Sequence, residues 1–352
     1  METTIDFLIG TYSHALGEEE AGGDGIHTAA IDTRSGEITP TRCLAHCVNP
    51  SYLAWGPGRK QLYATREVFA ADKPAVLRFA AAGDCLQSAA LDGELPCHVA
   101  VDESGRFLTS AQYGSGNVVC FRLGQDGAIL EPGQLIQHSG RGPNPRRQEG
   151  PHAHYAAVLR DGSLLVAIDL GIDAILAYTM DPVTGRVNTE PAFCHHTAPG
   201  SGPRHLVALS GTDTVYVYCE LSDDIVQLEL TPQGCQTVRT IRAFERDSDS
   251  EPAGAAIRIS PDRRHLYVSG RSQSQIAAFA IDPASGELTA VGTVATGGNS
   301  PRDFAITPDG RCLVVANQAS GAITSLRRDP LSGMLQTTGH SIALGSPVCI
   351  LF

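Results

Sequence analysis

The chain has 352 residues, of which 42% are hydrophobic and 18% are charged, and this composition excludes an intrinsically disordered protein. Its formal net charge of −12 argues against a surface built to coat nucleic acid or an anionic membrane. No stretch approaches the roughly 18 apolar residues of a membrane span, and the opening METTIDFLIG lacks the features of a signal peptide. We therefore expect a globular, cytoplasmic protein with no nucleic-acid partner and no membrane partner.

The ten cysteines are scattered along the chain. The closest pair is Cys43 and Cys47, and there is no C-x-x-C motif. Without a secretory signal, reduced thiols are the expected state, and the spacing predicts no disulfide framework.

Three short strands are expected first, at 5–13 (IDFLIGTYS), 25–33 (GIHTAAIDT) and 36–44 (GEITPTRCL). Six similar units then follow at 49–80, 95–123, 150–187, 202–230, 254–291 and 298–337. Each unit has an apolar strand, a turn such as PDG or ESG, two alternating strands and often a D-P-x-x-G turn before a fourth strand. The chain ends in a seventh opening strand, GSPVCILF.

The repeat spacing predicts the architecture. The units open at Pro50, Pro96, Pro151, Pro203, Ala253, Pro301 and Pro347. Four-stranded units of about 40 to 50 residues are typical of propeller blades. Since the last unit stops after one strand, the three N-terminal strands complete it, which also removes open sheet edges. The sequence predicts an all-β, seven-bladed β-propeller of four-stranded blades, one closed by N- and C-terminal strands, as a single domain over 1–352.

Polar residues recur at equivalent positions of the repeat, where a propeller gathers them at one mouth of its channel. The first strands carry His98, His152, His154, Arg204, His205, Arg302 and Asp303. The ends of the second strands carry Glu67, Gln112, Asp169, Glu220, Arg271 and Gln318. Structural roles are expected for His205 in packing, for Asp303 in capping turns and, with even weight, for Asp169.

Three arginines, Arg204, Arg271 and Arg302, point to an anion. Buried guanidinium groups need a carboxylate or phosphate partner, which an internal acid such as Glu220 or a bound ligand supplies. His152 and His154 lie two apart on a strand and form a possible metal pair, but no third ligand of clear spacing follows, so hydrogen-bonded histidines are favoured. P-loop, H-E-x-x-H and G-x-S-x-G motifs are absent.

Several motifs in order resemble one family. These are PHAHYAAVLRDGSLLVAIDLGIDAILAY, PGSGPRHL, CEL, RISPDRRHLYVSGR and GGNSPRDFAITPDGRCLVVANQ. They resemble the lactonase family of seven-bladed propellers, which includes cycloisomerase-type 6-phosphogluconolactonases and carboxy-cis,cis-muconate cyclases. The resemblance covers nearly the whole chain.

The resemblance implies a cofactor-independent, metal-free ester hydrolase acting on a sugar-acid lactone, foremost 6-phosphogluconolactone. The catalytic positions it implies are Glu220, His152, Arg204 and Arg271. In the hypothesis, Glu220 is the general base, Arg204 or Arg271 stabilises the oxyanion, and His152 orients the substrate or protonates the leaving oxygen.

Three further residues, Arg302, His98 and His154, are expected to bind a small anionic lactone or carboxylate substrate. Arg302, with the spare arginine, is expected to hold its phosphate.

Two positions depart from the family pattern. Gly270 stands where an asparagine usually precedes the arginine, and Ala256 stands where an acidic residue is usual. Two alternatives stay open: a carboxy-muconate cyclase-type lactonising enzyme, and a non-catalytic propeller that binds a partner or a sugar acid. Fold alone does not assign function. The Ala256 departure favours the second alternative.

Overall fold

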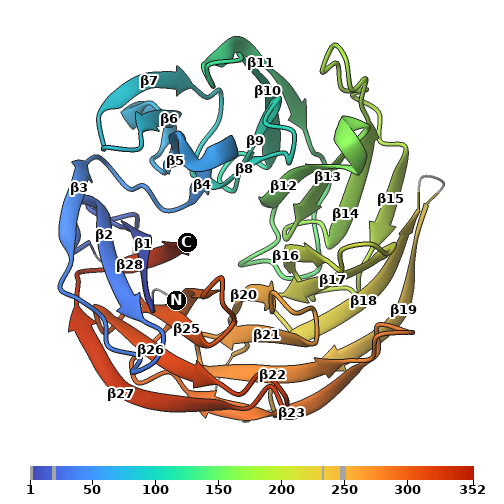
Figure 1. Cartoon of the computed structure of the whole chain (residues 1–352). Coiled ribbons are helices and arrows are strands. Elements are labelled where there is room, and N and C mark those ends of the chain that lie inside the picture. Colours follow the sequence, from blue (N-terminus) through green and yellow to red (C-terminus); the bar gives the residue numbers. More distant parts are fainter. Residues whose placement is uncertain (1–2, 18–20, 232–233, 246–250) are drawn as a thin grey trace. The chain divides into compact units, whose positions relative to one another are not determined.

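The structure is a computed structural model that describes residues 3–17, 21–231, 234–245 and 251–352. These residues form seven four-stranded sheets, in each of which neighbouring strands pair (Figure 1). The chain divides into two compact units. Unit 1 comprises residues 1–46, 205–230 and 236–352, and unit 2 comprises residues 47–204 and 231–235.

Unit 1 holds the sheet of the two chain ends and three later sheets. The first has the order β28 (Pro347–Leu351), β1 (Thr4–Thr11), β2 (Gly25–Asp32) and β3 (Arg42–His46). The next contains β16 (Pro203–Ala208), β17 (Thr214–Cys219), β18 (Asp224–Thr231) and β19 (Gly234–Arg242), of which a few residues belong to unit 2. The others contain β20 (Gly254–Ile259), β21 (His265–Gly270), β22 (Gln275–Ile281) and β23 (Leu288–Ala295), then β24 (Pro301–Ile306), β25 (Cys312–Asn317), β26 (Ala322–Arg328) and β27 (Leu335–Ala343).

Unit 2 holds the remaining three sheets. Their strands are β4 (Leu53–Trp55), β5 (Gln61–Arg66), β6 (Ala75–Ala80) and β7 (Cys85–Ala90); β8 (Pro96–Val101), β9 (Phe107–Gln112), β10 (Asn117–Leu123) and β11 (Ile129–Gln137); and β12 (Ala153–Leu159), β13 (Leu164–Asp169), β14 (Ala174–Thr179) and β15 (Phe193–His196). In the part of the chain that the structure describes, three short 3-10 helices lie in the connections, at Pro57–Arg59, Ala70–Asp72 and Arg160–Gly162. Within the described residues, none of the helices is long and apolar enough to span a membrane.

The prediction of seven four-stranded blades, one made of strands from both ends of the chain, is confirmed. β28 pairs with β1 in the register Ile350 to Ile9. One boundary was wrong: the third strand was expected at 36–44 and begins at Arg42. Ile38 forms only an isolated bridge to Ile31, and Pro40, which has no N–H to donate, follows it.

Each unit buries its apolar residues between neighbouring sheets. In unit 1, one core cluster joins β1 and β2 to β25 through residues such as Phe7, Ile31 and Val314. In unit 2, Leu165 and Phe107 belong to a cluster that joins β13 to β9. These contacts follow from the alternation of each strand, which presents apolar side chains to both adjoining sheets.

The repeated turns also tie neighbouring sheets together. In three places a buried tyrosine hydroxyl donates to a glycine carbonyl in a turn of the next sheet: Tyr63 to Gly127, Tyr216 to Gly286 and Tyr267 to Gly333. The turn residue Asp282 accepts from the backbone N–H groups of Ala284 and Ser285, which holds the pKa of Asp282 below its usual value. The turn closes at Gly286 with φ 69°, a conformation that favours glycine.

Candidate active site

The structure places the predicted polar residues where the second strands end. Gln112 and Asp169 are the last residues of their strands, whereas Glu67, Glu220, Arg271 and Gln318 come directly after theirs. All except Arg271 are buried. Their positions agree with the repeat analysis, while their roles in binding or catalysis stay predictions.

Glu220 and Arg271 form an ion pair inside unit 1. The guanidinium Nη2 of Arg271 lies 2.9 Å from Oε1 of Glu220. The same guanidinium group donates from Nε to the Ala253 carbonyl at 3.2 Å and from Nη2 to the Gly254 carbonyl at 3.4 Å. The Glu220 side chain is only 4% exposed, while that of Arg271 is 17% exposed. The positive member of this pair is therefore the one that solvent reaches.

Sequence analysis missed a second acid beside this pair, Asp223. It accepts a hydrogen bond from Gln273 at 2.9 Å and one from the Tyr218 hydroxyl at 3.4 Å. Burial, only partly offset by these bonds and by the charge of Arg271, raises the pKa of Asp223 to about 6. The SDD run after β17 was the available signal, because loops that follow second strands were expected to carry polar groups.

The two departures from the family pattern have local explanations. A side chain at Gly270 would meet Gln273 at 2.3 Å and the ring of Phe244 at 2.6 Å, so those two residues fill the space an asparagine would need. Ala256 is fully buried in an apolar cluster with Phe304 and Leu313. An acid at position 256 would lie among apolar side chains and would need a partner.

His152 in unit 2 is held by two acceptors. Its Nδ1 lies 2.9 Å from the Tyr113 carbonyl, and its Nε2 lies 3.2 Å from a carboxylate oxygen of Glu149. Although slight burial acts to raise it, hydrogen bonding and the charges of His152 and Arg147 hold the pKa of Glu149 below its usual value.

His154 and His98 occupy separate aromatic surroundings in the same unit. His154 lies edge-on to Tyr113, whose ring stacks on His152 at 4.4 Å, and its Nδ1 lies 3.6 Å from the Cys97 sulfur. His98 is packed between the rings of Tyr52 and Tyr155. Among the described residues no metal-ligating group forms around His152 or His154.

The remaining predicted residues have mixed surroundings. Arg302 donates to the Tyr12 hydroxyl at 2.7 Å and lies over its ring, and it donates to Gln318 at 3.4 Å. Arg204, buried on β16, belongs to unit 2. The structure thus brings Glu220 and Arg271 together in one unit and His152 and His154 around Tyr113 in the other.

Structural roles were expected for Asp303 and His205 and, with even weight, for Asp169. Asp303 pairs with Arg258 at 2.7 Å and accepts from the backbone of Ile350, which ties β24 to β20 and β28. Asp169 accepts from His138 and from the backbone N–H of His152, so it orders the start of β12. His205 is buried on β16.

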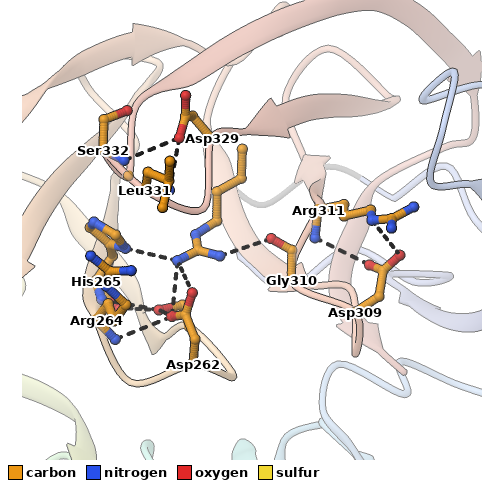
Figure 2. Close-up of polar contacts among 12 residues, drawn as sticks. Asp262, Arg264, His265, Asp309, Gly310, Arg311, Asp329, Leu331 and Ser332 are labelled. Carbon is orange, nitrogen blue, oxygen red and sulfur yellow. Dashed lines mark hydrogen bonds and ion pairs between the residues drawn. The ribbon is translucent and has the colours of Figure 1, made fainter.

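A second buried arginine cluster lies at the opposite end of β21. Figure 2 shows Asp262, His265 and Gly310 converging on one guanidinium group, which belongs to Arg328. Arg328 donates to both carboxylate oxygens of Asp262, to Nδ1 of His265 and, from Nε, to the Tyr267 hydroxyl. The Arg328 side chain is 1% exposed and that of Asp262 is 34% exposed.

Two cavities within single units do not contain the predicted site residues. One of about 460 Å³ in unit 1 has Asp262 and His265 in its lining, beside Leu209 and Leu331. Both titratable groups are held by Arg328, so we assign no chemistry to this cavity. The other, of about 440 Å³ in unit 2, lies around Met180.

Comparison with known proteins identifies the family of this chain. The family described as "Lactonase, 7-bladed beta-propeller" matches residues 6–352. A Bacillus subtilis protein named 6-phosphogluconolactonase is 34% identical over 301 residues, which are 84% of this chain and 83% of the relative.

Solved structures agree with this match. A putative 6-phosphogluconolactonase from Bacteroides uniformis has a TM-score of 0.88 at 31% identity and 99% coverage of both chains. A periplasmic gluconolactonase from Pseudomonas aeruginosa has a TM-score of 0.89 at 27% identity, covering 99% of this chain and 98% of its own. The chain therefore belongs to the lactonase family of seven-bladed β-propellers.

Proposed function

We propose that this protein is a lactonase that hydrolyses a sugar-acid lactone, foremost 6-phosphogluconolactone to 6-phosphogluconate. The family match, the name of the Bacillus subtilis relative and the structural neighbours support this function. The single observation that carries it is the Glu220–Arg271 pair, in which a buried carboxylate positions a partly exposed guanidinium.

Lactone hydrolysis requires three groups from the protein: a base, a positive group and a proton donor. Water attacks the ring carbonyl, a carbon–oxygen bond forms, and the water proton passes to a base. The tetrahedral oxyanion needs a preorganised positive group, and the ring oxygen needs a proton when its bond to the carbonyl carbon breaks. The product is an open hydroxy acid.

In this proposal Glu220 is the base and Arg271 is the positive group. Glu220 is fixed by an ion pair of 2.9 Å and takes the water proton. Arg271 presents its exposed face to the oxyanion or to the anionic group of the substrate, since a guanidinium fork matches both. Their contact means that the guanidinium needs no reorganisation when charge develops on the substrate.

A role for His152 in orienting the substrate or protonating the leaving oxygen stays a prediction. Its ring is held between the Tyr113 carbonyl and the Glu149 carboxylate. Arg204, Arg302, His98 and His154 are proposed to bind the substrate. Substitution of His152 by Ala tests its role separately from the Glu220–Arg271 pair.

The location and cofactor requirement belong to the same proposal. A cytoplasmic location is part of the proposal, because the scattered spacing of the ten cysteines predicts no disulfide framework. The proposed steps use side-chain acids and bases throughout, so the reaction is proposed to need no cofactor.

The direct experiment is hydrolysis of freshly prepared 6-phosphogluconolactone by the purified full chain, followed by acid release. The expected result is a rate well above the spontaneous rate that saturates with substrate. A rate equal to the spontaneous one, from protein that melts cooperatively, would remove the proposal.

A second substrate, unphosphorylated gluconolactone, is favoured by the Pseudomonas aeruginosa neighbour. The same assay with both lactones separates the two. A kcat/KM that is larger for the phosphorylated lactone supports a phosphate-binding arginine, and equal values assign the chain to unphosphorylated lactones.

A further inference from the structure

Four potential metal ligands meet on the sheet of the two chain ends. Ligand atoms of Asp24, His27 and Cys43 all lie within 4.8 Å of one another. Nε2 of His27 is 2.5 Å from one carboxylate oxygen of Asp24. His46 adds a fourth group, because its Nδ1 is 3.4 Å from the other oxygen of Asp24 and 3.5 Å from the sulfur of Cys43. All four residues belong to unit 1.

A local irregularity of β3 gathers these side chains. His27 on β2 is paired with Cys43 on β3, and Gly25 is paired with His46. Between these pairs the register shifts, so that Leu44 is the extra residue of a bulge. In a regular strand, positions 43 and 46 would face opposite sides of the sheet, whereas a bulge changes that phase. The bulge thus allows both side chains to reach Asp24.

The donor set selects among metal ions. Magnesium and calcium prefer oxygen ligands, of which this group has only the Asp24 carboxylate. One sulfur, two imidazole nitrogens and one carboxylate suit Zn²⁺, which takes four such ligands in a tetrahedron. Zinc bonds of about 2.0–2.3 Å hold ligand atoms roughly 3.3–3.8 Å apart. The widest distances in the group therefore need to shorten by up to about 1 Å, and the 2.5 Å contact between His27 and Asp24 needs to lengthen by about 0.8 Å.

Hydrogen bonding alone leaves part of the group unexplained. Nδ1 of His46 lies near three acceptors, namely both the carboxylate and carbonyl of Asp24 and the Cys43 sulfur. A single proton on that nitrogen serves only one or two of them, while a cation placed among the ligand atoms serves the sulfur and the carboxylate together.

We propose that Asp24, His27, Cys43 and His46 bind one Zn²⁺ ion. Binding replaces the thiol proton of Cys43 by the metal and releases that proton to solvent. The ion joins the entry of β2 to β3, which is the outermost strand of its sheet and only five residues long (Figure 1). Its role is to fasten this strand to the sheet, a role separate from the proposed hydrolysis.

The experiment uses the full chain after chelator treatment and dialysis. Co²⁺ replaces Zn²⁺ as a spectroscopic probe, since it takes the same ligands and its thiolate bond produces a charge-transfer band. We expect one Co²⁺ per chain with that band, displacement by Zn²⁺, and a higher melting temperature with Zn²⁺ because the ion binds the folded state.

Matched variants make the assignment specific. Cys43→Ser removes the proposed ligand, and Cys85→Ser removes an exposed thiol on β7 that is outside the group. The charge-transfer band should disappear in Cys43→Ser and persist in Cys85→Ser. His46→Ala should raise the Kd for Zn²⁺ by about 100-fold or more. Binding of less than one equivalent by the folded wild type, or an unchanged band in Cys43→Ser, would overturn the proposal.

Discussion

Two buried arginine–carboxylate pairs lie at opposite ends of β21, and they expose opposite charges. At the end of the strand, Glu220 is buried and Arg271 reaches solvent. At its start, Arg328 is buried and the partly exposed member is Asp262. The first arrangement presents a positive group to solvent, and the second presents a negative one. The charge of the more exposed residue, rather than the presence of an ion pair, therefore distinguishes the candidate site from the structural pair.

The two pairs also sit beside groups that respond oppositely to acid. Burial and the neighbouring Arg328 lower the pKa of His265, so its contribution to stability is complete above about 6.5 and is lost as the pH falls. Burial raises the pKa of Asp223 to about 6, so the native state there binds a proton before the unfolded chain does. A fall in pH therefore reduces the stability that His265 contributes beside Arg328. It also removes the cost of burying the charge of Asp223 beside Arg271.

The largest expected effect is on stability, at the Arg328 end. Asp262→Ala leaves a buried guanidinium with neutral acceptors only, so the free energy of unfolding should fall by about 3–5 kcal/mol. Urea unfolding at pH 7 measures this loss. The kcat of the folded protein should be unchanged, and a fall in kcat without a fall in stability would reverse the roles assigned to the two pairs.

An intermediate effect, opposite in sign, is expected at Asp223. The wild type loses stability as the pH rises from about 4 to 6, because the buried carboxyl must give up its proton. The shift of about two pKa units sets an upper limit of about 3 kcal/mol. Asp223→Asn removes this cost, so the variant should be the more stable protein at pH 7 and should match the wild type near pH 4.

The neighbouring Asp224 provides a control for that comparison. Its side chain makes a long contact of 3.5 Å with the exposed Arg242, so Asp224→Asn should change stability by less than about 1 kcal/mol. Denaturant unfolding of both variants across pH 4 to 7 is the measurement. Parallel pH profiles for Asp223→Asn and the wild type would contradict the raised pKa of Asp223.

The smallest change in free energy is expected from Arg271→Lys. Lysine keeps the charge that balances Glu220 but loses the planar fork, so stability should change little while kcat/KM falls about 100-fold. The test combines a melting curve with lactone hydrolysis. Equal losses of stability and activity would make Arg271 a structural residue like Arg328.

Sequence patterns predicted the blades because each four-stranded unit repeats the same order of strands and turns. They also predicted which residues follow the second strands, since Glu220 and Arg271 hold equivalent repeat positions. They could not predict the contact of Asp223 with Tyr218, because it depends on a left-handed backbone at Asp223, with φ 57°. That conformation is uncommon outside glycine, although aspartate is among the residues that tolerate it.

Two other arrangements lay beyond the sequence for a related reason. Arg328 and Asp262 are 66 residues apart on different sheets, and nothing in their local patterns pairs them. The group around Cys43 depends on a register shift that strand alternation does not reveal. In each case, packing between elements decides the contact, whereas periodicity decides only the elements.

The central claim is that the buried carboxylate of Glu220 serves chemistry in a lactonase. The most direct measurement compares kcat for 6-phosphogluconolactone hydrolysis by Glu220→Gln and by the wild type. Melting curves of the two proteins should give the same melting temperature. We expect a loss of about 10²- to 10⁴-fold with the fold intact, because the amide fills the same space and accepts no proton. An unchanged kcat in a folded variant would contradict it.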